Sequence, residues 1–225
     1  MLLAIDTATE TLSIALHDGD ALVAEVTLNA GRKHSALLAP LIERTMTQAE
    51  LSLDGLSALA VSVGPGSYTG TRIGVALAKG LAAPRGLPLL PVTTLETVLA
   101  AQSPRQDDLP QVATVSAGRN RVIWAEYGCE TGAWIERRAP RIRDWQALLT
   151  TCDRPFRLSG EVSPAGLAAI RSAREAGATI QLAPAAQRIR RAGYLAEVAW
   201  RRLRESDASA FPADRVMPVY LQGPA

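Results

Sequence analysis

Hydrophobic residues near the start of the chain form short strand-like runs, and a longer run with helical spacing follows them. The apolar runs at residues 2–5, 12–16 and 22–28 predict three consecutive strands. An Asp-Gly-Asp turn at residues 18–20 joins the last two, so we expect the strands to be antiparallel. Residues 35–48 predict a helix whose apolar positions cover more than one stripe. We therefore expect one face of this helix to pack on its own sheet and the other to be free for a partner. The apolar positions are Leu37, Leu38, Leu41, Ile42 and Met46.

The central stretch of the chain combines a buried strand, a glycine–proline turn and a helix. Residues 59–63 predict the strand, and residues 69–83 predict the helix, which contains several glycines. A glycine inside a helix costs about 1 kcal/mol relative to alanine, so its repeated use indicates that something passes close to the backbone. Gly70, Gly74 and Ala78 have four-residue spacing, and we expect them to form a groove into which another element settles.

The second half of the chain repeats the order of elements predicted for the first. Three strand-like runs, a helix, a strand and a further helix follow one another in each half, which predicts a duplicated α/β fold. A polar, proline-bounded stretch at residues 103–110 marks the boundary between the halves. We expect a first subdomain of residues 1–104, completed by a tail at residues 206–225, and a second subdomain of residues 105–205.

The composition is typical of a globular protein, and we expect it in the cytoplasm. Apolar residues make up 48% of the chain and charged residues 20%. No apolar run approaches the roughly 20 residues of a membrane-spanning helix, and the first residues lack the basic start of a signal peptide. Cys129, Cys152, His17 and His34 have no ligand spacing, so we expect neither a metal site nor a disulfide.

Charge is distributed unevenly along the chain. Residues 1–100 contain six Lys and Arg against nine Asp and Glu, a net charge of −3. Residues 101–225 contain eighteen against thirteen, a net charge of +5. Either this asymmetry helps an RNA approach the second half, or it reflects solvated arginine-rich faces, and the sequence leaves both interpretations open.

The glycine turn has the setting of a nucleotide-binding loop but lacks its fingerprints. Unpaired amide groups often bind an anion where a strand leads through glycines into a helix. A P-loop would need Gly-Lys-Ser/Thr from position 71, where this chain has Thr71-Arg72, and a dinucleotide-binding turn would need glycine in place of Thr69. The sequence leaves two interpretations open for this segment, a tight packing turn or an anion site. The candidate nucleotide- or anion-binding residues are Asp6, Gly64, Gly66 and Ser67, with Asp6 as the carboxylate that would hold magnesium and phosphate.

Hydroxyl groups at the start of this helix do not predict hydrolysis. Ser67 and Thr69 would need a base, and neither His17 nor His34 is placed by the sequence to supply one. No pair of carboxylates has a spacing that is typical of acid–base catalysis. We expect no catalytic residue and no cofactor in this chain.

Four motifs in the chain resemble the bacterial TsaB family, also called YeaZ. They are residues 5–9 (IDTAT), 32–35 (RKHS), 64–74 (GPGSYTGTRIG) and 218–221 (PVYL). The resemblance spans most of the chain and is strongest over residues 1–100. It implies the two-subdomain fold of the actin, Hsp70 and sugar-kinase (ASKHA) superfamily, with a ribonuclease H-like α/β core.

The resemblance also implies a role and partners. Members of the family are dimerisation subunits of the bacterial tRNA threonylcarbamoyladenosine machinery. A catalytic paralogue, TsaD, acts with them and with an ATPase, TsaE, to transfer a threonylcarbamoyl group to the adenosine beside the anticodon of tRNA. The paralogue carries a metal-binding His-x-x-x-His, whose equivalent positions here are Thr94 and Val98, and neither can bind the metal. Where the family has an Asp-Ala-Arg-Arg-like segment, this chain has Ser116-Ala117-Gly118-Arg119, so it lacks that aspartate.

We therefore expect a non-catalytic scaffold that pairs its first subdomain with a TsaD-like paralogue through a helical bundle. Exposed apolar surface would pair two copies of the chain when it is alone. The alternative hypothesis is an ATP–magnesium-dependent phosphotransferase or ATPase of the same fold, with Asp6 holding the metal. The expected interface residues are Leu37, Leu38, Leu41, Ile42, Thr45, Tyr68, Gly70, Arg72, Gly74, Val75, Ala78 and Lys79.

Overall fold

The computed structural model describes residues 1–105, 107, 109–152 and 154–221. The chain divides into two compact units. Unit 1 comprises Met1–Ala100 and Arg191–Tyr220, and unit 2 comprises Ala101–Arg190 together with Leu221. No helix within the described residues is long and apolar enough to cross a membrane.

Unit 1 is built on a five-stranded sheet with the order β3-β2-β1-β4-β5. The first three strands are antiparallel, as the hairpin pattern predicts, and β4 and β5 continue the sheet parallel to β1. In this register Ile5 lies between Ile14 and Val61. The strands are β1 (Leu2–Asp6), β2 (Thr11–His17), β3 (Leu22–Asn29), β4 (Ala58–Ser62) and β5 (Leu89–Val92).

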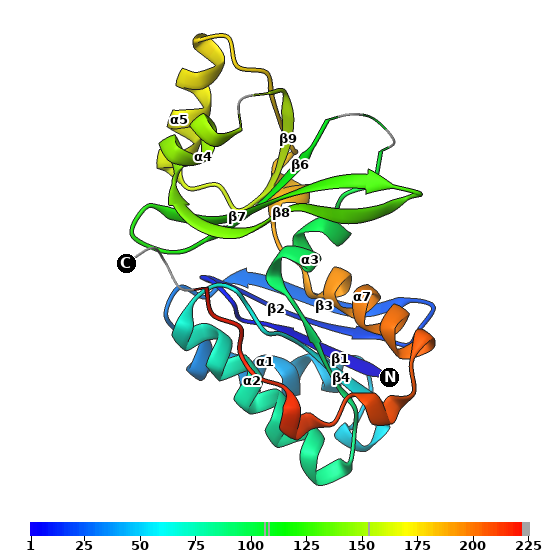
Figure 1. Cartoon of the computed structure of the whole chain (residues 1–225). Coiled ribbons are helices and arrows are strands. Elements are labelled where there is room, and N and C mark those ends of the chain that lie inside the picture. Colours follow the sequence, from blue (N-terminus) through cyan, green and yellow to red (C-terminus); the bar gives the residue numbers. More distant parts are fainter. Residues whose placement is uncertain (106, 108, 153, 222–225) are drawn as a thin grey trace. The chain divides into compact units, whose positions relative to one another are not determined.

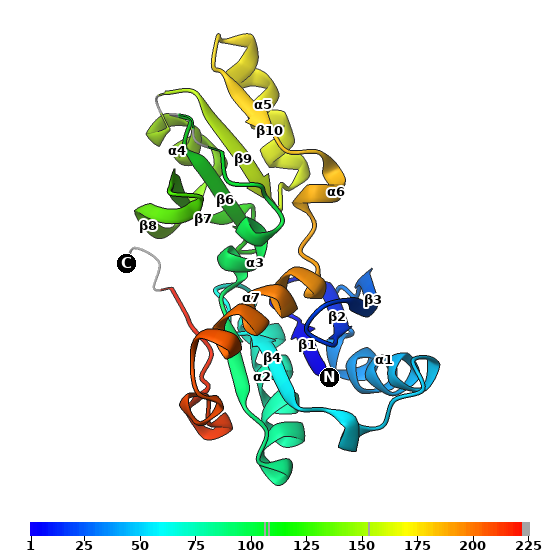
Figure 2. The same cartoon turned by 90° about the vertical axis from the view of Figure 1, so that its right-hand side faces the viewer.

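Helices cover both faces of this sheet (Figure 1, Figure 2). Helices α1 (His34–Gln48) and α2 (Tyr68–Ala82) pack on one face, where they meet the side chains of Leu3 and Ile5. Helix α7 (Ala192–Glu205) packs on the other face, against Leu2 and Ala4, and α3 (Thr94–Ala100) lies beside it. Alternate residues of β1 thus point into two separate apolar layers, as expected for a strand that is buried on both faces.

The placement of α7 differs from the expected subdomain boundary. The order of elements assigned residues 191–205 to the second subdomain, whereas the structure includes them in unit 1. The reason is the apolar face of α7, which is buried on the sheet of unit 1, while the amide of Ala192 donates to Oγ of Ser13 (2.8 Å). Residues 206–220 follow α7 in unit 1, and residues 222–225 of the expected tail lie outside the described residues.

Unit 2 repeats the topology of unit 1 with the sheet order β10-β9-β6-β7-β8. Strands β6, β7 and β8 are antiparallel, and β9 and β10 continue the sheet parallel to β6. The duplicated α/β fold predicted from the sequence is therefore confirmed. The elements are β6 (Gln111–Ser116), β7 (Arg121–Glu130), β8 (Ala133–Asp144), α4 (Trp145–Thr151), β9 (Phe156–Gly160), α5 (Pro164–Glu175), β10 (Ile180–Leu182) and α6 (Ala185–Arg188).

Candidate partner-binding surface

Strand β4 leads into α2 through a tight turn. The peptide bond between Gly64 and Pro65 is cis, and Gly64 has a φ of +96°. Ser67 is the N-cap residue of α2, because its hydroxyl accepts a hydrogen bond from the amide of Gly70 (3.1 Å). The hydroxyl of Thr94, at the start of α3, donates to the carbonyl of Pro65. These contacts fix the first turn of α2 at the carboxyl end of β4.

Three glycines of this segment lie against the turn that follows β1. A Cβ atom on Gly66 would lie 2.1 Å from the carbonyl oxygen of Ala8, and one on Gly70 would lie 2.2 Å from that of Thr7. A Cβ atom on Gly74 would lie 2.3 Å from Oγ1 of Thr7, whose hydroxyl donates to the carbonyl of Gly70 (2.7 Å). The expected groove exists, but the chain's own β1–β2 turn fills it. The assignment of Gly70 and Gly74 to a partner interface is therefore wrong, because both are buried within unit 1.

Most of the remaining expected interface residues are also buried in unit 1. Leu37 is half-buried, and the second apolar stripe of α1 faces α2 and the segment of residues 51–53. The expectation of a free apolar face on α1 is corrected accordingly, because the sheet and the neighbouring helix use both stripes. The residues that expose 5% or less of their surface are Leu38, Leu41, Ile42, Thr45, Val75 and Ala78.

The candidate anion-binding residues make contacts within the chain. Asp6 is buried, and its Oδ1 accepts a hydrogen bond from the amide of Ala8 (2.9 Å). The amide of Ser67 donates to the carbonyl of Ala8 (2.6 Å), and a Cβ atom on Gly64 would lie 2.7 Å from the carbonyl oxygen of Val219. These contacts favour the packing-turn interpretation, and the anion site stays a prediction.

The largest exposed aromatic side chains of unit 1 form one cluster at the start of α2. The ring centroids of Tyr68 and Tyr220 lie 4.9 Å apart, and these residues are 55% and 41% exposed. The guanidinium of Arg72 lies 3.9 Å from the centre of the Tyr68 ring, and its Nε donates to Oη of Tyr220 (2.8 Å). That hydrogen bond holds the pKa of Arg72 above its usual value. An arginine is positively charged at physiological pH in any case, so the cluster carries one positive charge.

The C-terminal segment that supplies Tyr220 runs beside α2, as Figure 1 shows in red. The amide of Val219 donates to the carbonyl of Val63 (2.7 Å). Nζ of Lys79 donates to the carbonyls of Asp214 (2.9 Å) and Val216 (3.0 Å). Lys79 therefore holds the C-terminal segment on α2. Beyond these contacts Met217 and Val219 are 66% and 42% exposed.

An apolar groove of about 380 Å³ lies between α1 and α2. The residues that line it are Ala39, Ile42, Glu43, Met46, Thr47, Leu51, Leu53, Leu77 and Leu81. Between this groove and the C-terminal segment, α2 exposes a stripe at four-residue spacing that consists of Tyr68, Arg72, Ala76 and Gly80. We call the groove, this stripe and residues 217–220 together the helical face of unit 1.

The sequence did not single out Ala76, Gly80, Leu77, Leu81 or Met217 as surface residues. The four-residue spacing of small residues was visible, but it does not tell which stripe faces the sheet. The stripe that includes Gly70 and Gly74 faces inward, and the stripe that includes Ala76 and Gly80 faces outward. The C-terminal segment gave no helical or strand signal that would place it on α2.

No group of three or more His, Cys, Asp or Glu side chains arranged to hold a metal ion occurs among the described residues. His17 is buried and lies 3.1 Å from Oε1 of Glu197, and its Nδ1 accepts a hydrogen bond from the amide of Gly19 (3.0 Å). His17 therefore secures the β2–β3 turn to α7. Thr94 and Val98 are both buried in α3.

The family model described as TsaD, tRNA N6-adenosine threonylcarbamoyltransferase, matches residues 23–224. The tRNA threonylcarbamoyladenosine biosynthesis protein TsaB of Escherichia coli (strain K12) is 38% identical over 134 residues, which are 59% of this chain and 58% of that protein. The protein of the same description from Bacillus subtilis (strain 168) is 36% identical over 163 residues, which are 71% of this chain and 70% of that protein. The chain thus spans little more than half of the first relative's length.

Solved structures share the fold. YeaZ from Pseudomonas aeruginosa superposes with a TM-score of 0.73 at 22% identity, over 97% of this chain and 99% of that one. The activator of the 2-hydroxyisocaproyl-CoA dehydratase from Clostridium difficile, solved with bound ADPNP, superposes with a TM-score of 0.54 at 10% identity, over 92% of this chain and 97% of that one. These similarities confirm the ASKHA-like fold that the motifs implied. The chain therefore belongs to the family that the TsaD model describes and, within it, to the TsaB (YeaZ) group.

Proposed function

We propose that this chain is a non-catalytic subunit of a tRNA-modifying complex and binds a TsaD-like catalytic paralogue through the helical face of unit 1. The complex would transfer a threonylcarbamoyl group to the adenosine beside the anticodon of tRNA. Its relatives are named for tRNA threonylcarbamoyladenosine biosynthesis and the matching family for tRNA N6-adenosine threonylcarbamoyl transfer, which supports this reaction.

The helical face is the observation that carries the proposal. It combines an apolar groove, an exposed pair of tyrosines stacked with an arginine, and exposed apolar side chains of the C-terminal segment. Tyrosine and arginine are enriched where protein interfaces are strongest, and contiguous exposed apolar surface is typical of interaction sites.

The outward stripe of α2 suits close packing of a partner helix. Ala76 is exposed, and a Cβ atom on Gly80 would meet no atom within 4 Å. Small residues one turn apart let another helix approach the backbone closely, while the groove beside them accepts its larger side chains. The helical-bundle interface expected from the sequence is therefore proposed again, with Ala76 and Gly80 in place of Gly70, Gly74 and Ala78.

A non-catalytic role is supported by the chemistry of this chain. The positions that correspond to the paralogue's metal ligands are Thr94 and Val98 in this chain, and neither is a residue type that typically binds this metal. The metal and the transfer chemistry would then belong to the paralogue. We further propose a TsaE-like ATPase as a third component, a homodimer through the same helical face when the paralogue is absent, and a cytoplasmic location.

The substitution Ala76→Arg tests the proposal. It places a long charged side chain on the exposed stripe without touching the core, whereas charges at Leu41 or Val75 would enter the core itself. We expect loss of copurification with the paralogue, with binding weakened at least 100-fold, because a desolvated charge and a steric clash together cost about 3 kcal/mol or more. Ala168→Arg, on an exposed position of α5 in unit 2, is the matched control and should retain binding. Wild-type copurification of the Ala76→Arg chain would exclude the helical face.

Titration with ATP–magnesium separates this proposal from a phosphotransferase. We expect the purified chain alone to show no micromolar binding, because Asp6 and the amide of Ser67 already bond to the β1–β2 turn. Saturable micromolar binding that Asp6→Ala abolishes would favour an ATP-using enzyme instead.

A further inference from the structure

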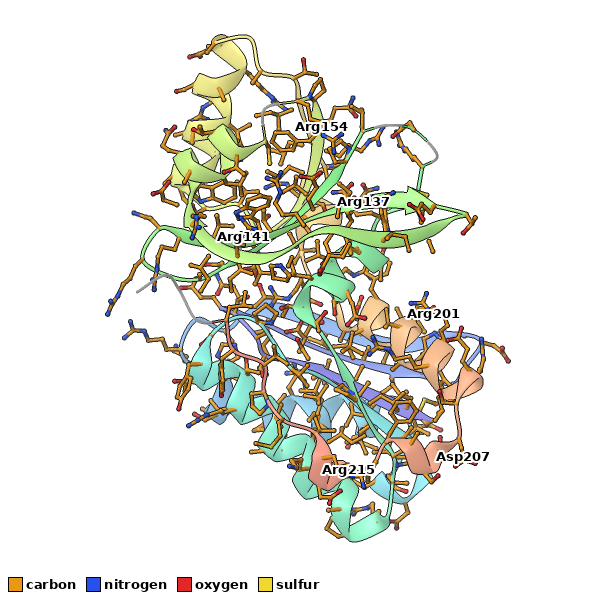
Figure 3. The ribbon with its side chains drawn as sticks, in the orientation of Figure 1. Arg137, Arg141, Arg154, Arg201, Asp207 and Arg215 are labelled. Atoms are coloured by element: carbon orange, nitrogen blue, oxygen red, sulfur yellow. The ribbon has the colours of Figure 1, made fainter. Side chains whose placement is uncertain are left out.

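Arginines gather on one edge of unit 2. Strand β8 forms the end of the sheet and carries Arg137, Arg138, Arg141 and Arg143. Figure 3 shows Arg137 and Arg141 on this strand. Arg137 and Arg141 are exposed, and Arg138 and Arg143 are half-buried.

Ion pairs divide these arginines into two groups. Toward the β7–β8 turn, Arg137 pairs with Glu130, and Arg138 pairs with the buried carboxylate of Glu126. Arg154 pairs with the same carboxylate (2.8 Å). The positive charge at this end of the strand is therefore largely compensated.

At the opposite end of the strand the arginines lack such partners. Within the part of the chain that the structure describes, no ion pair is found for Arg119, Arg121, Arg141 or Arg143. We call these four residues the arginine patch. They carry four formal positive charges, and an arginine outside an ion pair leaves its guanidinium donors open to an anion.

The strand register places the arginine patch at one end of the sheet. Arg143 lies opposite Val122 and Arg141 opposite Trp124, so both project from the same face of β8, about 7 Å apart along the strand. Arg121 begins β7 opposite Asp144, so its side chain projects from the other face of the sheet, and Arg119 lies in the turn before it with a φ of +49°. Two carboxylates lie near the patch. Oδ1 of Asp144 caps α4 by accepting a hydrogen bond from the amide of Ala147 (2.8 Å), and Oε2 of Glu161 accepts one from the amide of Ser116 (2.9 Å).

We propose that the arginine patch binds the phosphate backbone of RNA, and specifically of the tRNA substrate. The inference rests on the proposed function for the choice of RNA, and it assigns the contact to a surface of unit 2 that is separate from the helical face. Arginine presents a planar fork of donors that matches phosphate oxygens. Exposed Ser116 and Asn120 beside the patch are further donors of the kind that contact phosphates.

An acidic protein partner fits this surface less well than RNA does. The core of a protein interface is depleted in charge and built on apolar or aromatic side chains. Around the arginine patch the exposed residues are small or polar, including Ser116, Gly118 and Asn120. The large exposed apolar residue of β8, Ile135, lies at the other end of the strand, opposite Gly128.

The double substitution Arg141→Gln/Arg143→Gln tests the inference. The probe is a fluorescently labelled tRNA transcript without modifications, titrated with the full chain, alone and in complex with the paralogue, at several salt concentrations. Four phosphate contacts predict a slope of log K against log salt of about −3. The double variant should bring the slope to about −1.5, so that a fourfold rise in salt weakens its binding about 8-fold instead of about 60-fold.

Two further variants serve as controls. Arg201→Gln/Arg215→Gln removes two exposed arginines of unit 1, labelled in Figure 3, and should leave the slope unchanged. Arg141→Lys/Arg143→Lys keeps the charge and should keep most of the slope, whereas a variant that acts by misfolding would not be restored by lysine.

The outcomes separate this inference from the proposed function. Equal slopes for the wild type and for both glutamine variants would overturn the RNA contact, and so would loss of paralogue binding with unchanged RNA binding in Arg141→Gln/Arg143→Gln. Copurification with the paralogue is measured on the same samples. If it persists while the slope is unchanged, the proposed function stands and the arginine patch alone is excluded.

Discussion

The helix that follows the fourth strand of each sheet begins with the same spacing of glycine and serine. Unit 1 has Gly64, Ser67 and Gly70, and unit 2 has Gly160, Ser163 and Gly166 at matching positions. Gly64 and Gly160 have φ values of +96° and +93°. Each serine accepts a hydrogen bond from the amide of the second glycine, three residues later (3.1 Å in both units).

The two units differ in what the second glycine meets. Gly70 lies against the backbone carbonyl of Thr7, whereas Gly166 lies against the indole ring of Trp145. The ring is held in place because its Nε1 donates to Oγ of Ser163 (3.0 Å). The shared motif thus fixes a helix at the end of a strand in both units, and the surfaces around it are free to differ. Unit 1 exposes tyrosines and an apolar groove, and unit 2 exposes arginines.

Alanine at the second glycine should affect the two units unequally. Gly70→Ala forces a Cβ atom to within 2.2 Å of a backbone oxygen, which cannot move without the β1–β2 turn. We expect a loss of about 3 kcal/mol in the free energy of unfolding, the upper end for overpacking. Gly166→Ala places its Cβ 2.4 Å from the Trp145 ring, and a side chain yields more readily than a backbone carbonyl even where a hydrogen bond holds it, so we expect a smaller loss of about 1–2 kcal/mol.

Chemical denaturation followed separately for each unit measures both changes, because two units need not unfold together. Gly80→Ala is the control, since its Cβ would meet no atom within 4 Å, and it should stabilise unit 1 by about 0.5–1 kcal/mol. A smaller loss of unfolding free energy for Gly70→Ala than for Gly166→Ala would contradict the expected difference between the two units.

Alanine at the capping serine should destabilise unit 2 more than unit 1. Ser67→Ala removes one side-chain cap, for an expected loss of about 1 kcal/mol. Ser163→Ala removes the cap of α5 and also the acceptor of the buried Trp145 indole, so we expect about 2 kcal/mol. The same denaturation experiment reports both values, and equal losses would show that the indole hydrogen bond contributes little.

The smallest effect concerns acid stability. The guanidinium of Arg157 hydrogen-bonds Asp107 (2.7 Å for one pair of atoms) and holds the pKa of that carboxyl below its usual value. Because the folded pKa is depressed, this contribution is present above the unfolded pKa of about 3.9 and is lost as pH falls through the folded value. We expect that in Asp107→Asn the melting temperature of unit 2 falls less steeply as the pH is lowered below about 4, and that the melting temperature of unit 1 is unchanged. An unchanged pH dependence of the unit 2 melting temperature would contradict a stabilising role of the Arg157–Asp107 pair.

The architecture could be predicted from the sequence, because strand alternation, turn residues and the repeated order of elements are local signals. The placement of α7 could not, since the apolar pattern of a helix does not tell which of two sheets it packs on. The same limit applies to α2. Four-residue spacing of Gly70 and Gly74 indicated close approach of a backbone, but not that Thr7 of the same chain makes it. Tyr220 and Tyr68 are far apart in sequence, so no local pattern could join them.

Hydrogen–deuterium exchange of the chain, diluted until it is monomeric, with and without its TsaD-like paralogue tests the central claim most directly, since slowed exchange reports the backbone that an interface covers. We predict slower exchange on adding the paralogue in α1, in α2 and in residues 213–220, with no change in β7 and β8. Protection confined to unit 2, with α2 exchanging at its free rate, would contradict the assignment of the helical face as the partner-binding surface.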